Sequence, residues 1–178
     1  MKLKNRAFLL LLFLIGNVCV FAQGVNYVGT SSANFLKIGI GAKNAGTGES
    51  DITDAADASI LYWNPGAISR LSEVSLSVSY LDWLVGSNMA NLSCTVPLGF
   101  VTAGLDITYF TSGDIEETTL ADQDGTGRFF SATDIALGLT LAKNITDRFS
   151  VGLKVKYLSE SLSSVSSSAV AFDIGSVF

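Results

Sequence analysis

Five charged side chains stand within otherwise apolar or small-residue segments in the second half of this sequence of 178 residues. They are Asp106, Asp134, Lys154, Lys156 and Asp173. Carboxylates and amines can exchange protons with a substrate, but more often they pair with each other or are solvated. The chain contains no histidine, which excludes Ser-His-Asp triads and histidine-bound metals. We therefore expect these residues to be paired or solvated charges, and the protein not to be an enzyme.

A short motif with strong conformational preferences lies at Tyr62-Trp63-Asn64-Pro65-Gly66. Pro65 fixes its own φ and disfavours helical geometry at Asn64. The Asn64 side chain can bond to nearby backbone and set a turn, and the two aromatic rings can pack against a wall. Two interpretations stay open: the motif ends a helix before the first strand, or it belongs to a plug with a gating or binding role.

Glycine is concentrated just before this motif, at Gly39, Gly41, Gly46 and Gly48. Glycine allows positive φ and close backbone approach but weakens helices. We therefore expect an irregular, tightly packed segment over residues 23–72, with a short helical turn at 54–62. No Gly-Lys-Ser/Thr sequence follows these glycines, so a nucleotide site is not expected.

The acidic stretch from Asp122 to Gly127 is similar to the start of a calcium-binding loop, but the further ligands and the closing glutamate of an EF-hand are missing. We expect an external turn there, and neither a metal nor a cofactor. The whole chain has 11 Lys and Arg against 16 Asp and Glu. Because nucleic-acid affinity comes from neutralising phosphates, nucleic acid is not an expected partner.

The N-terminus has the features of a cleaved secretory signal peptide. Lys2, Lys4 and Arg6 precede an apolar run over residues 7–20, and the two positions that determine cleavage, Val20 and Ala22, carry small residues. The run is shorter than the roughly 20 residues that a spanning helix needs. We therefore expect a signal peptide over residues 1–22, and export of the protein.

From residue 73 onward, apolar and polar side chains alternate. Val74, Leu76 and Val78 share one face, with Ser75 and Ser77 opposite. Period two is the pattern of a β-strand with one apolar and one polar face. It recurs in six expected strands, at 73–80, 89–97, 100–110, 129–142, 149–158 and 169–178. The expected fold class is all-β.

The strands fit an antiparallel transmembrane β-barrel of an outer membrane. Each has about ten residues, the length of a tilted membrane-crossing strand, and aromatic residues cluster near the ends, where interfacial girdles lie. Those are Tyr80, Trp83, Phe100, Tyr109, Phe110, Phe129, Phe149 and Tyr157. Short connections at 97–99 and 143–148 alternate with connections at 84–88, 111–128 and 159–168 that are on average longer and more polar. In such a barrel the five charged residues line the lumen. The alternative is a secreted β-sandwich.

Six strands are fewer than the eight of the smallest single-chain barrels. We therefore expect either the N-terminal part of a longer barrel or a chain that pairs with others. The expected organisation is a signal peptide at 1–22, a hatch segment at 23–72 and the first six barrel strands at 73–178.

The segment from Gly29 to Gly46, together with Asp57-Ala-Ser, Leu61-Tyr-Trp-Asn-Pro65 and Ile68-Ser-Arg-Leu71, resembles the PorV/PorQ family. These outer-membrane proteins are similar to FadL-type transporters. The resemblance implies a FadL-like barrel of about fourteen strands with an N-terminal hatch that carries an Asn-Pro-Ala motif. Here Gly66-Ala67 follows Asn64-Pro65, and Thr47-Gly-Glu-Ser-Asp51 replaces the family's Met-Gly-Gly-Ala and apolar run.

The resemblance implies a role in type IX secretion at the bacterial outer membrane, in cargo shuttling or surface attachment of secreted proteins. The partners would be outer-membrane lipid, other secretion-system proteins and secreted cargo, with loop 111–128 making protein contacts. The alternative is a FadL-like channel for uptake of hydrophobic small molecules. A third hypothesis is a soluble secreted β-domain such as an adhesin, which would not stay with the membrane.

Overall fold

The computed structural model describes residues 32–50 and 52–178. The expected signal peptide at 1–22 and the start of the hatch segment, at 23–31, lie outside the described residues. The described part of the chain, from Ser32 onward, forms one compact unit.

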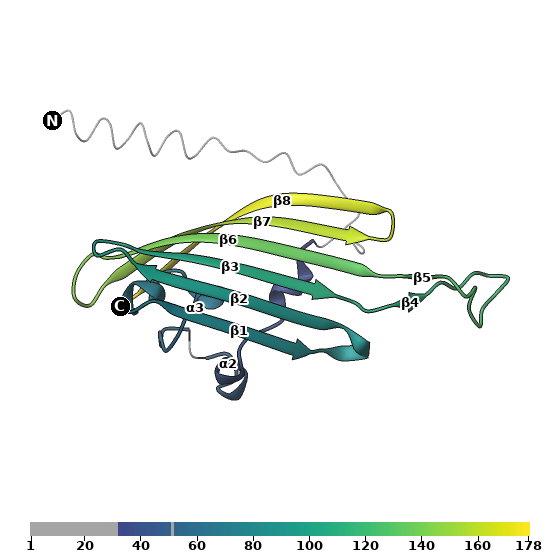
Figure 1. Ribbon diagram of the computed structural model, residues 1–178, viewed down its shortest axis with the longest axis horizontal. Helices are drawn as coiled ribbons and strands as arrows, with labels where there is room; N and C mark the ends of the chain where they lie inside the picture. Colours follow the sequence, from purple (N-terminus) through teal and green to yellow (C-terminus); the bar gives the residue numbers. More distant parts are fainter. Residues whose placement is uncertain (1–31, 51) are drawn as a thin grey trace, which may run out of the picture. The chain divides into compact units, whose positions relative to one another are not determined.

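The unit is built on a single antiparallel sheet in which consecutive long strands are neighbours (Figure 1). Its strands, in spatial order, are β1 (Ser75–Asp82), β2 (Asn88–Pro97), β3 (Thr102–Thr111), β6 (Ala132–Asn144), β7 (Ser150–Leu162) and β8 (Val165–Val177). The six expected strands and the all-β class are confirmed. Among the described residues, β1 and β8 each pair with one neighbour only, so they are the two edges of the sheet.

One expected loop is wrong. Residues 159–168 continue β7 and β8, and only Ser163 and Ser164 turn the chain, with Ser163 at a positive φ of 54°. Ser166, Ser167 and Ser168 make β8 polar on both faces here, so the period-two signal that marks a half-apolar strand disappears although the ladder continues.

The connection between β3 and β6 is long, as expected, and carries a small ladder of its own. β4 (Ile115–Glu116) pairs with β5 (Phe129–Phe130), and both project beyond the end of the main sheet (Figure 1). The expected strand at 129–142 is therefore two strands, separated at Ser131. The connection between β1 and β2 holds a short 3₁₀ turn, η3 (Leu84–Gly86).

The N-terminal segment is mostly irregular, with four short helical turns: η1 (Asn34–Lys37), α2 (Ala42–Gly46), α3 (Ile60–Trp63) and η2 (Ala67–Arg70). The helical turn expected at 54–62 is only α3. Before it, the Asp57 side chain accepts a hydrogen bond from the Ser59 backbone at 2.7 Å, and such a local bond competes with helix formation.

The segment packs on the polar face of the sheet, and the apolar face is left open. Ser93, Thr95 and Thr140 are fully buried beneath it. Large apolar side chains on the other face are more than half exposed, among them Leu76, Val78, Leu105, Leu139, Phe172 and Ile174. A soluble sheet protein buries its apolar face, so this arrangement is inverted.

Two small clusters of buried apolar side chains join the segment to the sheet. The first contains Ile60, Leu61, Ala67 and Ile68 with Ala142 and Val177 of the sheet. The second contains Phe35 and Ile40 with Met89, Ala136 and Leu158 of the sheet. No helix in the described ranges has the length and apolar character to span a membrane.

Candidate functional site

Asn64 joins the N-terminal segment to the last strand of the sheet. Its backbone is extended (φ −147°, ψ 105°) at the end of α3, as the following proline predicts. Its side-chain oxygen accepts a hydrogen bond from the Gly66 backbone at 2.9 Å, which is the expected local turn. Its amide nitrogen donates to the carbonyls of Ile52 and Ser176, each at 3.2 Å. The Asn64 side chain therefore forms a local turn and also binds the N-terminal segment to β8.

Pro65 and Gly66 lie directly against glycines of the sheet. A Cβ at Gly66 would lie 2.6 Å from the Gly175 carbonyl oxygen, and a Cβ at Gly175 would meet the Pro65 ring at 2.7 Å. A Cβ at Gly152 would collide with the Pro65 backbone. Only glycine at these three positions permits so close an approach of backbones. The motif is thus docked on β7 and β8 by backbone contact.

Tyr62 and Trp63 use their polar groups differently from Asn64. The Tyr62 hydroxyl lies 2.8 Å from both the Leu36 and the Ile38 carbonyl oxygens, and the Trp63 indole donates to Ile40 at 3.1 Å. The two rings meet edge to face at 5.4 Å. Both rings pack beside clusters that include residues of the sheet, and their hydrogen bonds hold the earlier part of the N-terminal segment.

Burial and charge keep Tyr62 a hydrogen-bond donor. Desolvation raises the pKa of its hydroxyl well above the usual value, and the nearby carboxylates of Glu49 and Asp106 raise it further. All of these effects disfavour the phenolate. The hydroxyl therefore stays protonated wherever the fold is intact at ordinary pH.

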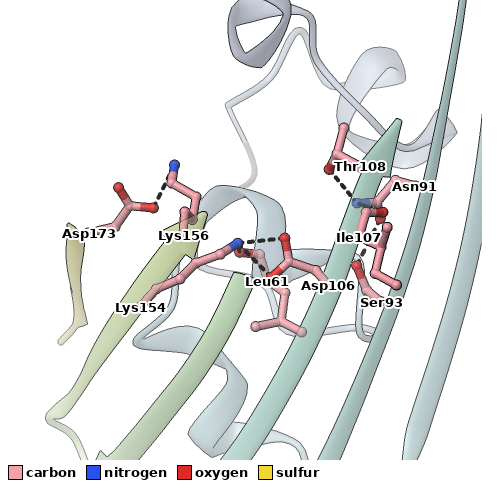
Figure 2. Close-up of polar contacts among 9 residues, drawn as sticks. All are labelled: Leu61, Asn91, Ser93, Asp106, Ile107, Thr108, Lys154, Lys156 and Asp173. Atoms are coloured by element: carbon pink, nitrogen blue, oxygen red, sulfur yellow. Dashed lines mark hydrogen bonds and ion pairs between the residues drawn. The ribbon is translucent and has the colours of Figure 1, made fainter. Parts of the chain in front are cut away.

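Lys154 and Asp106 form a buried ion pair next to Leu61 of the N-terminal segment (Figure 2). The Lys154 ammonium lies 2.8 Å from the carboxylate and also donates to the Leu61 carbonyl at 3.0 Å. The side chains are 2% and 3% exposed. An ion pair so deeply buried is stable only when hydrogen bonds satisfy its groups, and here Leu61 of the N-terminal segment supplies one of them.

The other three expected lumen charges are Lys156, Asp173 and Asp134, and they are not part of the Lys154–Asp106 pair. Lys156 and Asp173 form a second ion pair at 2.8 Å, more exposed than the first (Figure 2). Asp134 stands opposite Glu160 in the register of β6 and β7, nearer the long-loop end. The structure therefore brings four of the five charges together as two pairs and leaves Asp134 apart from them.

Three of the four glycines predicted from the sequence have a structural reason. Gly41 and Gly48 have positive φ values of 93° and 64°, and a Cβ at Gly39 would lie 3.0 Å from the Trp63 ring. Gly46 has open space around it and an ordinary φ, so no requirement for glycine is visible there.

The sequence analysis missed a second set of glycines, on the inward face of the strands. Gly104 leaves room for Leu61, 2.7 Å from where a Cβ would stand, and Gly138 leaves room for Lys154 at 2.5 Å. Gly152 and Gly175 receive Pro65. The signal was available: glycine recurs on the polar side of four strands, and strand glycines often mark close approach of another backbone.

Cavities remain between the N-terminal segment and the polar face of the sheet. One of about 330 Å³ lies between residues 39–45 and strands β1 and β2, and a smaller one of about 40 Å³ lies beside Lys154 and Asp106. The smaller cavity is lined by Leu36, Tyr62, Asp106, Thr108, Ala136, Lys154 and Lys156. In residues 32–50 and 52–178, no group of three histidine, cysteine, aspartate or glutamate residues could hold a metal ion, and this includes the acidic turn at Asp122.

Comparison of the chain with protein-family models, with curated proteins and with solved structures gave no match.

Proposed function

We propose that this chain is part of the wall of an outer-membrane β-barrel, with residues 32–72 as a hatch on the lumen side. The observation that carries the proposal is the inverted sheet. Its polar face is covered by the chain's own N-terminal segment, while its apolar face is open across all six long strands. Lipid hydrocarbon is the environment that suits such a face.

The extent of the open face argues against the soluble β-domain. Contiguous apolar patches on soluble monomers seldom exceed roughly 300–600 Å². Here apolar side chains adjoin from strand to strand, for example Leu105, Leu139 and Val155, which are direct neighbours in the register. The rows beside them are also apolar. A β-sandwich would need a second sheet to cover this face.

Aromatic side chains support a membrane orientation across the strands. Tyr80 and Tyr109 stand in one row of the register, joined through Ala90, at the end of the sheet that carries the long β3–β6 connection. Phe100 and Phe178 are exposed at the opposite end. Aromatic belts at two levels, with an apolar band between them, are typical of barrels that cross the outer membrane.

The two edge strands, β1 and β8, need further hydrogen-bond partners if the sheet lies in a membrane. In hydrocarbon, the unpaired amides and carbonyls of β1 and β8 would each cost several kcal/mol. We therefore infer that both edges pair with further strands, and that the complete barrel has about fourteen, as the resemblance to FadL-like proteins implies.

Within this class we propose a PorV/PorQ-type protein that serves type IX secretion. The support is the Tyr-Trp-Asn-Pro motif and the glycine-rich segment before it. The β3–β6 connection, with its ladder β4–β5, extends past the sheet (Figure 1) and offers a surface for secretion-system partners and cargo. A channel for hydrophobic small molecules is less well supported, since the inward face carries two ion pairs and many Ser and Thr side chains.

Two measurements test the proposal in order. Fractionation of cells that express the tagged protein should find it in the outer membrane, resistant to extraction with salt and carbonate; release into the soluble fraction would contradict the barrel. Deletion of the gene should then leave type IX cargo inside the cell. Normal surface delivery in the deletion strain would refute the secretion role while leaving the barrel intact.

A further inference from the structure

Two parts of the hatch are attached to the sheet in different ways. The anchor, residues 58–71, holds the motif and is largely buried. The cover, residues 33–40, lies on the polar face nearer the long-loop end. Between them, residues 42–50 and 52–57 are exposed except for Asn44 and Ala55. The two parts are therefore separated by a stretch that has little packing of its own.

The anchor is bound to the sheet by close backbone packing and by buried hydrogen bonds. The backbones of Pro65 and Gly66 lie against Gly152 and Gly175, and Asn64 donates to β8. Lys154 adds a buried hydrogen bond to the Leu61 carbonyl (Figure 2). Moving the anchor would break an ion-paired network and open a cavity in the first apolar cluster at once.

The cover contacts the sheet mainly through apolar packing, which includes stacking of the Phe35 ring on Phe110 of β3 at a centroid distance of 6.5 Å. Phe35 and Ile40 pack on Met89, Ala136 and Leu158. One polar tie to the sheet is the bond from the Ala33 backbone to Glu160. Three backbone carbonyls of the cover bind the anchor: those of Leu36 and Ile38 lie at the Tyr62 hydroxyl, and that of Ile40 accepts from the Trp63 indole.

We propose that the cover is a lid that lifts from the sheet while the anchor stays in place, and that Tyr62 and Trp63 are the residues that hold the lid closed. Asn64, Pro65 and Gly66 then stay bound to the sheet. Tyr62 and Trp63, which we call the latch, hold the cover in its closed position. The inference rests on the contacts between hatch and sheet and does not depend on the type IX assignment.

Two alanines on β6 provide matched reporters. Ala136 and Ala142 both face inward and both are 2% exposed. Ala136 is buried with Phe35 and Ile40 of the cover, whereas Ala142 is buried with Leu61 and Ile68 of the anchor. In a Cys94→Ala background, each is replaced by cysteine, and the purified full-length chain is labelled in micelles with a water-soluble maleimide.

The latch is weakened by Tyr62→Phe together with Trp63→Phe, which remove the hydroxyl and the indole donor. We expect labelling at A136C to rise roughly tenfold, because losing two hydrogen bonds of ordinary strength shifts an opening equilibrium by that factor or more. Tyr62→Phe alone, whose ring packs beside the cluster of Ala136 and not that of Ala142, should raise labelling at A136C and leave labelling at A142C at the parental rate. Tyr80→Phe with Trp83→Phe removes the same groups from exposed aromatics and should change neither reporter.

An equal rise in labelling at A136C and A142C in the folded protein would mean that the hatch moves as one body. No rise in labelling at either position would mean that the hydrogen bonds of Tyr62 and Trp63 do not keep the cover closed. Either result overturns the proposal. Heat-modified gel mobility shows whether the barrel is folded. If the double variant is unfolded, the single variants Tyr62→Phe and Trp63→Phe are compared with the same reporters. Asn64→Ala weakens the anchor and not the cover, so it should raise labelling at A142C more than labelling at A136C.

Discussion

Lys154 on β7 and Asp106 on β3 form their ion pair across the intervening strand β6. In the register, Lys154 stands opposite Thr140 and Asp106 stands opposite Gly138, so the pair is diagonal and passes over Gly138. The Lys154 ammonium then reaches the Leu61 carbonyl of the hatch. The Lys154 side chain thus connects two strands of the sheet to residues 58–71 of the N-terminal segment.

Removing either partner of this pair should be far more damaging than removing both. Asp106→Asn or Lys154→Met leaves one buried charge without a counter-charge, which costs about 3–5 kcal/mol. The double variant should recover part of that loss, because an uncharged pair needs no compensation. Urea unfolding of the protein refolded in lipid vesicles measures the cycle. Lys156→Met with Asp173→Asn is the more exposed control, with side chains 17% and 37% exposed, and should cost less, about 0–1 kcal/mol. Additive losses at Asp106 and Lys154 would contradict the coupling.

Gly138→Ala should weaken the same pair without removing a charge. A Cβ at this position would lie 2.5 Å from the Lys154 side chain and would also collide with the Asp106 carboxylate. Both must shift, and overpacking of this kind costs about 1–3 kcal/mol. The matched control is Gly46→Ala, since Gly46 has open space around it and alanine is the better helix residue. A Gly138→Ala variant as stable as the parent, measured by the urea midpoint, would show that the wall adjusts freely there.

The hydroxyl of Tyr62 predicts a pH dependence with a definite sign. Its pKa is raised from the usual 10.0 by burial and by the carboxylates of Glu49 and Asp106. Above about pH 10 the unfolded chain ionises this tyrosine while the folded chain keeps it protonated, so the free energy of unfolding falls as pH rises. Below that pH the contribution is complete. The Tyr62→Phe variant lacks the ionisable hydroxyl, so its free energy of unfolding does not carry this pH-dependent contribution.

The comparison of parent and Tyr62→Phe isolates the effect, because all other groups titrate in both. The parent should be more stable by about 0.5–1.5 kcal/mol near neutral pH, and this advantage should shrink between about pH 10 and pH 11. Unfolding curves at several pH values measure it. Parallel pH profiles would show that Tyr62 is not desolvated in the folded protein.

How far the sequence predicts this structure depends on the range of each interaction. The alternation around Val74 to Val78 locates a strand, because one face of a half-apolar strand repeats every two residues. The extended backbone of Asn64 follows from Pro65, and its turn to Gly66 follows from the hydrogen-bonding capacity of its own side chain. The serine-rich ends of β7 and β8 were missed because both faces are polar.

The fastening of the hatch could not be predicted in the same way. The carbonyls that Tyr62 and Trp63 bind lie in a segment without periodicity, so their positions depend on the folded path of the chain. The diagonal from Lys154 to Asp106 requires the registers of two separate strand pairs. Polarity placed these charges on one face; only the register shows which of them meet.

The outward face of the sheet gives the most direct test of the membrane assignment. Leu139 lies on β6 in the middle of the apolar face and is 59% exposed, with Leu105 and Val155 as its neighbours in the register. On a soluble protein, Leu139→Arg would be harmless, since an exposed arginine is well hydrated. In a bilayer it should destabilise the barrel by about 2–4 kcal/mol, because the charge lies near mid-depth. Leu120→Arg, in the β3–β6 connection at 97% exposure, is the matched control and should have no effect. Both variants are refolded into vesicles and unfolded with urea, and equal stability of the two would contradict a lipid-facing position for Leu139.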